Sequence, residues 1–233
     1  MGGVMSERGV IYIVWGRNAR TEKALERSRE SINSVHPELP VEVFRLDADD
    51  PVKGLLQKSR MLELSPFRET LYLDADTVVL GRLDFAFLKA QEFGLACCIC
   101  ECPWARRHGG IHGETVEYNT GVLFFNERAR PIFDSWSRLA PQIDSSIIFL
   151  GPQGQKLHMR YDDQCSFAVA IEETKILPFV LPLNWNFRPQ WQLSFFGPVK
   201  IWHDYEEPPP FFAEMRKYYD QPEPIIQYHV AMR

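Results

Sequence analysis

The segment LYLDADTVVL, residues 71 to 80, carries two carboxylates two positions apart in an otherwise apolar run. Residues two apart on a strand share a face, so Asp74 and Asp76 can point at one object, with Ala75 keeping the backbone approachable. Two converging carboxylates repel each other unless a cation or a shared proton lies between them. Because a hard divalent cation with oxygen ligands resolves this repulsion, the spacing predicts a metal site.

The same segment also fits a second chemistry. Haloacid-dehalogenase-type phosphatases place DxDxT after an apolar strand, and LYLDADTVV would supply Asp74 as nucleophile and Asp76 as acid/base. That motif normally occupies the first strand of its core, whereas two predicted strands and two predicted helices precede it here. The later acid pair of that fold would have to be Asp162 and Asp163, which follow a polar segment. The phosphatase remains the alternative interpretation.

The elements that must position the two aspartates alternate along the chain. Apolar runs predict strands, and apolar residues at helical spacing predict helices between them. In chain order these are a strand at 10–15, a helix ending before 36–37, a strand at 41–46, a helix at 52–64 and the 71–80 segment as third strand. This order predicts a parallel, doubly wound α/β sheet. Ligands bind outside the carboxyl ends of such strands, which is where the aspartates should lie.

The pattern is looser downstream. Strands are predicted at 93–100, 121–126 and 199–203, and helices at 128–139 and 162–172. Loops rich in Pro and Trp, at 181–191 and 206–212, are of the kind that shapes a pocket rim. No internal repeat or linker divides the 233 residues, so one compact domain is expected.

Composition excludes several classes of function. The net charge is −5 and the sequence pI is about 5.7, so no global positive field exists to hold nucleic acid or an anionic bilayer. The N-terminal MGGVMSERG lacks the basic and apolar regions of a signal peptide, and no apolar run approaches the ~18 residues of a membrane span. We therefore expect a soluble, cytoplasmic protein without a transmembrane segment.

Four of the five cysteines crowd into CCICEC, residues 97 to 102. On a strand, Cys98, Cys100 and Cys102 would face one way and Cys97 the other, which does not present four thiolates to one metal ion. Free, buried thiols in a reducing compartment are expected instead of a zinc site.

Five motifs in order suggest a family. They are LYLDADTVVLGRLD, YNTGVLFFN, YDDQ, LPLNWN and IWHD, and together they resemble the GT-A glycosyltransferases over residues 10 to 204. More narrowly they resemble family eight, the glycogenin and bacterial galactosyltransferase group. The resemblance implies a GT-A type nucleotide-diphospho-sugar transferase fold, with a Rossmann-like, mostly parallel central sheet flanked by helices. It also implies one catalytic domain over 1–233, with a nucleotide-binding half at 1–90 and an acceptor-binding half and C-terminal tail at 91–233.

The resemblance further implies a metal site and a donor site. Asp74 and Asp76 match the metal-binding DxD and His203 the third metal ligand, a set that suits Mn²⁺ better than Mg²⁺. The metal would bridge the two phosphates of a nucleotide-sugar, and the leading candidate for the nucleotide is UDP. The residues implied to bind this donor are Gly16, Asn18, Lys58, Arg60, Asp74, Ala75, Asp76 and Asn119.

Catalysis and acceptor binding are implied by the later motifs. Asp163 and Gln164 match the Asp-Gln pair beside the transferred sugar, and the family resembled is retaining, so Asp163 would act as nucleophile or stabilise positive charge on the donor carbon. Gly121 would permit close backbone approach. The acceptor, a sugar or glycan, would contact Trp185 and Asn186, together with Trp191 and the loop from His108 to His112.

The sequence also departs from the family pattern. After its late His the family continues with a Gly and a Lys-Pro-Trp, whereas this chain reads HDYEEPPPFF, which moves the expected phosphate contacts to Lys58, Arg60 or Arg216 and Lys217. The first loop, GRNAR, lacks the aromatic residue that commonly packs on uracil. A catalytically decayed nucleotide-sugar-binding protein is therefore a further alternative, and the oligomeric state is left open.

Overall fold

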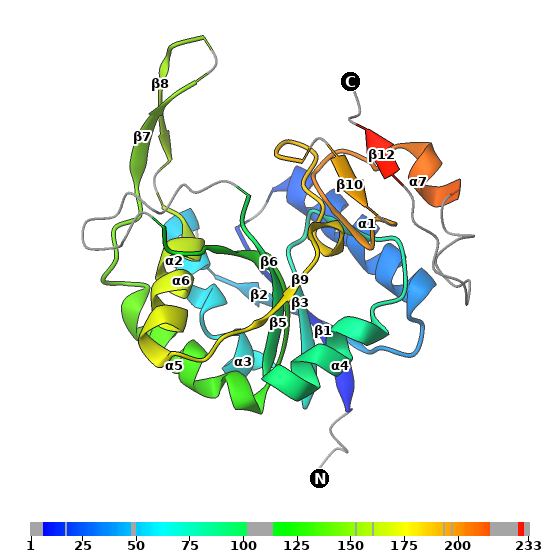
Figure 1. The fold of residues 1–233 in the computed structure, drawn as a ribbon, viewed down its shortest axis with the longest axis horizontal. Coiled ribbons are helices and arrows are strands. Elements are labelled where there is room, and N and C mark those ends of the chain that lie inside the picture. The colour runs from blue at the N-terminus through cyan, green and yellow to red at the C-terminus, as the bar shows by residue number, and fades with distance from the viewer. Residues whose placement is uncertain are drawn as a thin grey trace.

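The core of the molecule is a six-stranded sheet in the order β2-β1-β3-β6-β5-β9 (Figure 1). The computed structural model describes residues 7–16, 18–47, 50–101, 114–151, 153–159, 161–192, 194–196, 198–214 and 228–230. β6 is antiparallel to both of its neighbours, and the other pairs are parallel. The sheet is therefore mostly parallel, as expected. Its strands are β1 (Arg8–Trp15), β2 (Val41–Leu46), β3 (Glu69–Leu73), β5 (Leu95–Ile99), β6 (Tyr118–Asn126) and β9 (Phe179–Leu181).

Helices cover both faces of this sheet. One face packs against α1 (Ala19–Val35) and α4 (Asp84–Phe93), and the other against α2 (Pro51–Lys58), α3 (Met61–Leu64), α5 (Arg130–Leu139) and α6 (Asp163–Thr174) (Figure 1). Successive residues of β1 alternate between the two cores, with Tyr12 on the α1 side and Ile13 on the α5 side. Because both faces are covered, β1 reads as a continuous apolar run, whereas the edge strand β2, VEVFRL, is partly exposed and carries two charged residues.

Short elements complete the described chain. Three two-stranded sheets pair β4 (Thr77–Val79) with β11 (Ile201–His203), β7 (Ile147–Leu150) with β8 (Lys156–Met159), and β10 (Ser194–Phe196) with β12 (Tyr228–Val230). The β7–β8 hairpin projects from the body of the molecule (Figure 1). The remaining helical turns are η2 (Glu127–Ala129), η3 (Leu183–Trp185) and α7 (Pro210–Glu214).

Two sequence predictions of element boundaries were wrong. The segment 71–80 is two strands, because after Leu73 the chain turns and β4 leaves the central sheet to pair with β11. The predicted helix 52–64 is likewise divided into α2 and α3, since the backbone N–H of Arg60 bonds to Gln57 O in a tighter turn. The first break matters for function because it places Asp74 and Asp76 in a turn.

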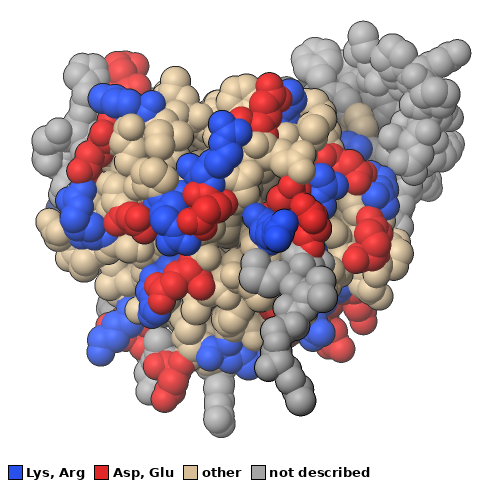
Figure 2. All heavy atoms as spheres, turned by 90° about the horizontal axis from the view of Figure 1, so that it is seen from below, with Lys and Arg blue, Asp and Glu red and all other residues tan. Residues whose placement is uncertain are grey.

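The described cysteines lie in the interior, and the face shown in Figure 2 carries charges of both signs. The side chains of Cys97, Cys98, Cys100 and Cys165 are buried, while Cys102 lies outside the described residues. Lys and Arg side chains intermingle with Asp and Glu over the described part of the face shown in Figure 2. Among the described residues, no helix has the length and apolar character needed to cross a membrane.

Candidate functional site

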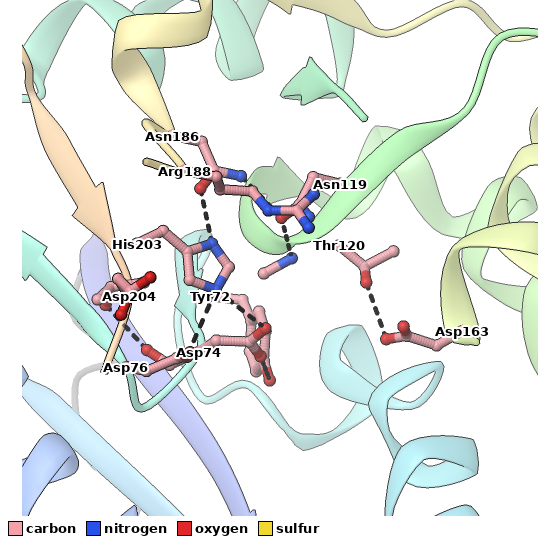
Figure 3. Close-up of polar contacts among 12 residues, drawn as sticks. Tyr72, Asp74, Asp76, Asn119, Thr120, Asp163, Asn186, Arg188, His203 and Asp204 are labelled. Carbon is pink, nitrogen blue, oxygen red and sulfur yellow. Dashed lines mark hydrogen bonds and ion pairs between the residues drawn. The ribbon is translucent and has the colours of Figure 1, made fainter. Parts of the chain in front are cut away.

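Asp74 and Asp76 lie in the turn that joins β3 to β4, at the carboxyl end of β3. The N–H of Asp74 donates to Gly121 O at 2.8 Å, and the N–H of Thr77 donates to Asp74 O at 3.2 Å and closes the turn. β4 then pairs with β11 in a register that sets His203 opposite Thr77. Side chains from two distant parts of the sequence therefore meet at one edge of the sheet (Figure 3).

The side chains of Asp74, Asp76 and His203 form a cluster that could hold a metal ion. One ligand atom from each lies within 4.8 Å of the others. His203 Nε2 is 3.4 Å from Asp76 Oδ1 and 3.8 Å from Asp74 Oδ2. Oxygen ligands lie about 2.1 Å from an ion such as Mg²⁺, so two ligands on opposite sides of it are about 4.2 Å apart. The three groups fit one small divalent ion after a modest adjustment.

The electrostatics of the cluster favour a positive charge at its centre. Burial opposes the charged form of His203, but the carboxylates of Asp76 and Asp74 outweigh it, and the pKa of the imidazole is raised. Burial also opposes ionisation of Asp76, yet the neighbouring His203 outweighs it and lowers the pKa of that carboxyl group. A proton on the imidazole or a metal ion can therefore offset the same carboxylate repulsion.

Lys58, at the end of α2, is buried between two carboxylates. Its Nζ lies 2.8 Å from Asp163 Oδ2 and 3.1 Å from Asp74 Oδ1, and the residue is only 3% exposed. Thr120 Oγ1 donates to the same Asp163 oxygen at 2.8 Å, and Tyr72 Oη donates to Asp74 at 2.7 Å. Burial opposes the ammonium charge, but Asp163 and Asp74 raise the pKa of Lys58 well above its ordinary value. Lys58 thus connects the cluster to α6.

The first residues of α6 lie beside this cluster. Asp162 caps the helix, since its Oδ1 accepts a hydrogen bond from the Gln164 N–H at 2.5 Å. Burial and the adjacent Asp163 raise the pKa of Asp162 to about 6. Gln164 Oε1 accepts from Asn119 Nδ2 at 2.8 Å. The structure therefore brings Asp163, Gln164 and Asn119 together at one cleft.

Two adjoining clefts open at this edge of the sheet and share the cluster. The first has a volume of about 250 Å³ and is lined by Leu55, Lys58, Asp74, Asp76, Asn119, Thr120, Gly121, Asp163, Gln164, Arg188, Gln190, Trp191, His203, Asp204 and Tyr205. The second has a volume of about 280 Å³ and is lined by Ile13, Val14, Trp15, Thr21, Leu55, Lys58, Asp74, Ala75, Asp76 and Tyr205. A ligand could therefore extend from one cleft into the other across the aspartates.

Three predicted site residues lie away from the clefts. Arg60 is on the surface, paired with Glu63 at 2.8 Å, and lines neither cleft. Trp185 packs in the core against Phe124, so we withdraw its assignment to acceptor binding. Asn186 is 1% exposed, and its amide is bonded to other side chains instead of facing solvent. Both Trp185 and Asn186 follow β9 within five residues, and both are buried.

Gly16 and Asn18, two further residues predicted to bind the donor, also line neither cleft. Gly16 follows β1 with a φ of 69°, which favours glycine, and Asn18 caps α1 by accepting from the Arg20 N–H at 2.9 Å. Trp191 is 41% exposed at the rim of the first cleft. The loop from 108 to 112 and the pair at 216 and 217 lie outside the described residues.

Sequence reasoning missed two aromatic side chains of the second cleft. Trp15 ends β1 immediately before the GRNAR loop, and a Cβ on Gly54 would lie 2.3 Å from its ring, so the indole packs directly on α2. Tyr205 follows the late His by two residues, and the Arg20 guanidinium lies 4.2 Å from its ring centroid. The signal in both cases was an aromatic residue adjoining a predicted site segment.

Arg188 is a third residue that the sequence did not single out. It lines the first cleft beside Asn119 and Asn186 (Figure 3), and its guanidinium is paired with Glu101 at 3.1 Å. Glu206 and Glu207, from the motif after His203, line neither cleft and instead pair with Arg20 and Arg27. The position of Arg188 in the Pro- and Trp-rich loop gave no periodic pattern from which to predict it.

Replacing Gly121 with alanine should disturb the cluster directly. The added Cβ would lie 2.4 Å from His203 Cε1 and 2.6 Å from Asp74 Oδ2, closer than such contacts allow. Overpacking of this kind typically costs about 1–3 kcal/mol, so denaturant unfolding should report a loss of that order. An unchanged free energy of unfolding would mean that the two side chains do not approach Gly121 as described.

Comparison with known proteins establishes the fold. No protein-family model and no curated protein sequence matches the chain. Among solved structures, the apo form of mouse xyloside xylosyltransferase 1 superposes with a TM-score of 0.56 at 15% identity, covering 86% of this chain and 99% of that one. An active-site mutant of LgtC gives 0.52 at 14%, covering 92% and 97%. A glycosyltransferase involved in glycosylation of the major capsid of PBCV-1 gives 0.51 at 14%, covering 90% and 99%. The chain has the GT-A glycosyltransferase fold, as predicted.

Proposed function

We propose that this chain is a metal-dependent glycosyltransferase that moves a sugar from a nucleotide-diphosphate donor to a sugar or glycan acceptor. The observation that supports this most strongly is the convergence of Asp74, Asp76 and His203 at the edge of a GT-A fold, beside Asp163 and Gln164. Family eight is the proposed family, and UDP is the proposed nucleotide of the donor. The proposed working unit is one domain, with the donor held mainly by 1–90 and the acceptor by 91–233.

The three cluster residues would hold the metal ion, with Mn²⁺ as the preferred ion and Mg²⁺ as the alternative. When bound, the ion would neutralise the donor diphosphate and the charge that develops on it as it leaves. The surrounding residues hold the carboxylates of Asp74 and Asp76 in position to bind the ion. Asp74 is held by Tyr72 and by the backbone bond to Gly121, and Asp76 lies against His203.

The nucleoside is assigned to the second cleft, where Trp15 and Tyr205 supply aromatic faces. A flat base packs well against such rings, and the shared aspartates then lie next to its diphosphate. Ala75, between the aspartates, lines this cleft with a side chain too small to obstruct a ligand. The chain departs from the family motif after His203, but Trp15 and Tyr205 could bind the donor in its place.

The transferred sugar is assigned to the first cleft, against Asp163, Gln164 and Asn119. Asp163 Oδ2 is contacted by Lys58 Nζ and by the Thr120 hydroxyl, which hold the carboxyl group in a fixed position. A fixed negative charge beside the donor carbon stabilises positive charge developing there, and a nucleophilic role for the same group would give retention. We propose a retaining outcome with Asp163 in one of these two roles.

The buried cysteines bear on the proposed cellular compartment, and the surface charges bear on the proposed partners. The odd number of cysteines and the burial of the four described thiols support the proposal of a reducing, cytoplasmic compartment. The mixed charges of the face in Figure 2 and the net charge of −5 support small-molecule and glycan partners over nucleic acid.

The decisive experiment measures donor hydrolysis and donor binding together. A thermal-shift panel of nucleotide-sugars with and without Mn²⁺ should single out one base, because a ligand at about 100 times its Kd stabilises by about 2.7 kcal/mol. The selected donor should then be hydrolysed slowly, and EDTA should stop the reaction. Binding without turnover would instead favour the decayed binding protein, and hydrolysis of simple phosphomonoesters would favour the phosphatase.

A further inference from the structure

A continuous row of side-chain amides runs from α6 to the metal cluster. Gln164 Nε2 donates to Asp162 Oδ2 at 3.1 Å, and Asn119 Nδ2 donates to Gln164 Oε1 at 2.8 Å. Asn186 Nδ2 donates to Asn119 Oδ1 at 2.7 Å, and Asn186 Oδ1 lies 2.8 Å from His203 Nδ1. The three amides, Gln164, Asn119 and Asn186, come from three separate segments of the chain. The last of them contacts the His203 imidazole (Figure 3).

The direction of this row is fixed by a backbone group. The N–H of Gly121 donates to Asn119 Oδ1 at 2.9 Å, and a backbone N–H can only donate. The Asn119 oxygen must therefore face Gly121, and its nitrogen must face Gln164. Asn186 in turn has to offer its nitrogen to the same Asn119 oxygen, which leaves its own oxygen toward the imidazole.

The tautomer of His203 follows from this direction. An amide oxygen only accepts, so the proton of the hydrogen bond to Asn186 must be on His203 Nδ1. In the neutral imidazole Nε2 then carries a lone pair, and Nε2 is the atom that faces Asp74 and Asp76 at 3.8 and 3.4 Å. A metal ligand needs that lone pair directed at the ion.

We infer that Asn186 is a positioning residue that holds the His203 imidazole in the Nδ1–H tautomer with Nε2 aimed at the metal. This inference rests on the proposed metal-dependent function, and it replaces the acceptor-binding role predicted for Asn186. The side chain is 1% exposed and both ends of its amide are bonded, so it serves the protein's interior and not a substrate. Through Asn119 it also connects the metal cluster to Gln164 at the donor-sugar face.

The experiment compares Mn²⁺ binding by the wild-type chain, Asn186→Ala and Asn186→Asp, followed by electron paramagnetic resonance with the metal alone. Loss of an outer hydrogen-bond partner of a metal ligand typically costs 10–100-fold in affinity, and we expect a loss in this range for Asn186→Ala. Asn186→Asp keeps an acceptor for the Nδ1–H, so it should retain most of the affinity. Its second oxygen would face the Asn119 oxygen, so it should instead lose stability.

The matched control is Asn184→Ala, in the same loop. The Asn184 amide is also buried, but it donates to Pro198 O at 2.6 Å. This variant should lower stability without changing Mn²⁺ affinity, which separates loop damage from imidazole positioning. Equal affinity of the wild-type chain and Asn186→Ala would overturn the inference while leaving the proposed function intact.

A second measurement does not need the metal. Long-range ¹⁵N–¹H correlation spectra of the metal-free protein, at a pH where the imidazole is neutral, should show His203 as the Nδ1–H tautomer, with the signal assigned by a His203→Gln variant. Asn186→Ala should move the population toward Nε2–H. An Nε2–H imidazole in the wild-type chain would overturn the inference, whereas failure of that chain to bind Mn²⁺ would overturn the metal-dependent function on which it rests.

Discussion

Replacing Asp76 with asparagine is expected to lower nucleotide-sugar turnover by about 10³-fold. The substitution preserves the shape of the side chain but removes one of two carboxylates that face His203 in the proposed metal cluster. A metal ion contributes several kcal/mol to stabilising a leaving diphosphate, and a loss of about 4 kcal/mol corresponds to about three orders of magnitude in rate. The measurement is the rate of Mn²⁺-dependent donor hydrolysis at saturating Mn²⁺.

The control for this prediction is Asp84→Asn. Asp84 is paired with Arg82 on the surface at 2.8 Å and lines neither cleft, so its loss should leave turnover unchanged. Turnover that survives both EDTA and Asp76→Asn would rule out the metal mechanism. A parallel fall in the free energy of unfolding would have to be excluded before the rate is interpreted.

Replacing Lys58 with methionine is expected to reduce both stability and turnover. The ammonium group is buried between Asp163 and Asp74, so its removal leaves two carboxylates without their shared cation. Breaking a buried ion pair in this way costs about 3–5 kcal/mol. Urea unfolding should therefore show a fall of that size in the free energy of unfolding. Donor hydrolysis should also fall because the two carboxylates lose their fixed positions.

A double substitution and a neighbouring residue sharpen this test. Lys58→Met combined with Asp163→Asn should be less destabilised than the sum of the single changes, because the asparagine removes a charge that Lys58 had balanced. Arg60→Met, two residues away, should change stability by no more than about 1 kcal/mol since its pairing with Glu63 is exposed. Equal effects of the two single substitutions at 58 and 60 would contradict the buried role of Lys58.

These contrasts show where sequence reasoning was limited. Lys58 and Arg60 are both basic residues in one predicted helix, and the sequence treats them alike. The turn at residues 57–60 ends α2, which leaves one side chain buried beside the cluster and the other on the surface. Because helix termination depends on how α2 and α3 pack on the sheet, local pattern alone could not separate them.

Asn186 illustrates the same limit in the site itself. Its place in LPLNWN suggested contact with an acceptor, since a Trp and Asn in a loop often line a pocket. The structure buries it between Asn119 and His203, residues 67 and 17 positions away in the chain. Hydrogen bonds between such distant residues leave no spacing signal in the sequence.

The sequence by itself predicted an α/β sheet and singled out Asp74 and Asp76 as candidate ligands, because alternating strand and helix patterns and a charged pair in an apolar run are local features. Only the tertiary structure decided that these aspartates lie in a turn, and that pairing of β4 with β11 brings His203 to them. It also decided that Lys58 and Asn186 face inward to hold the cluster. The physical reason is that burial and pairing between distant segments depend on how the whole chain packs, which the local pattern of residues does not reveal.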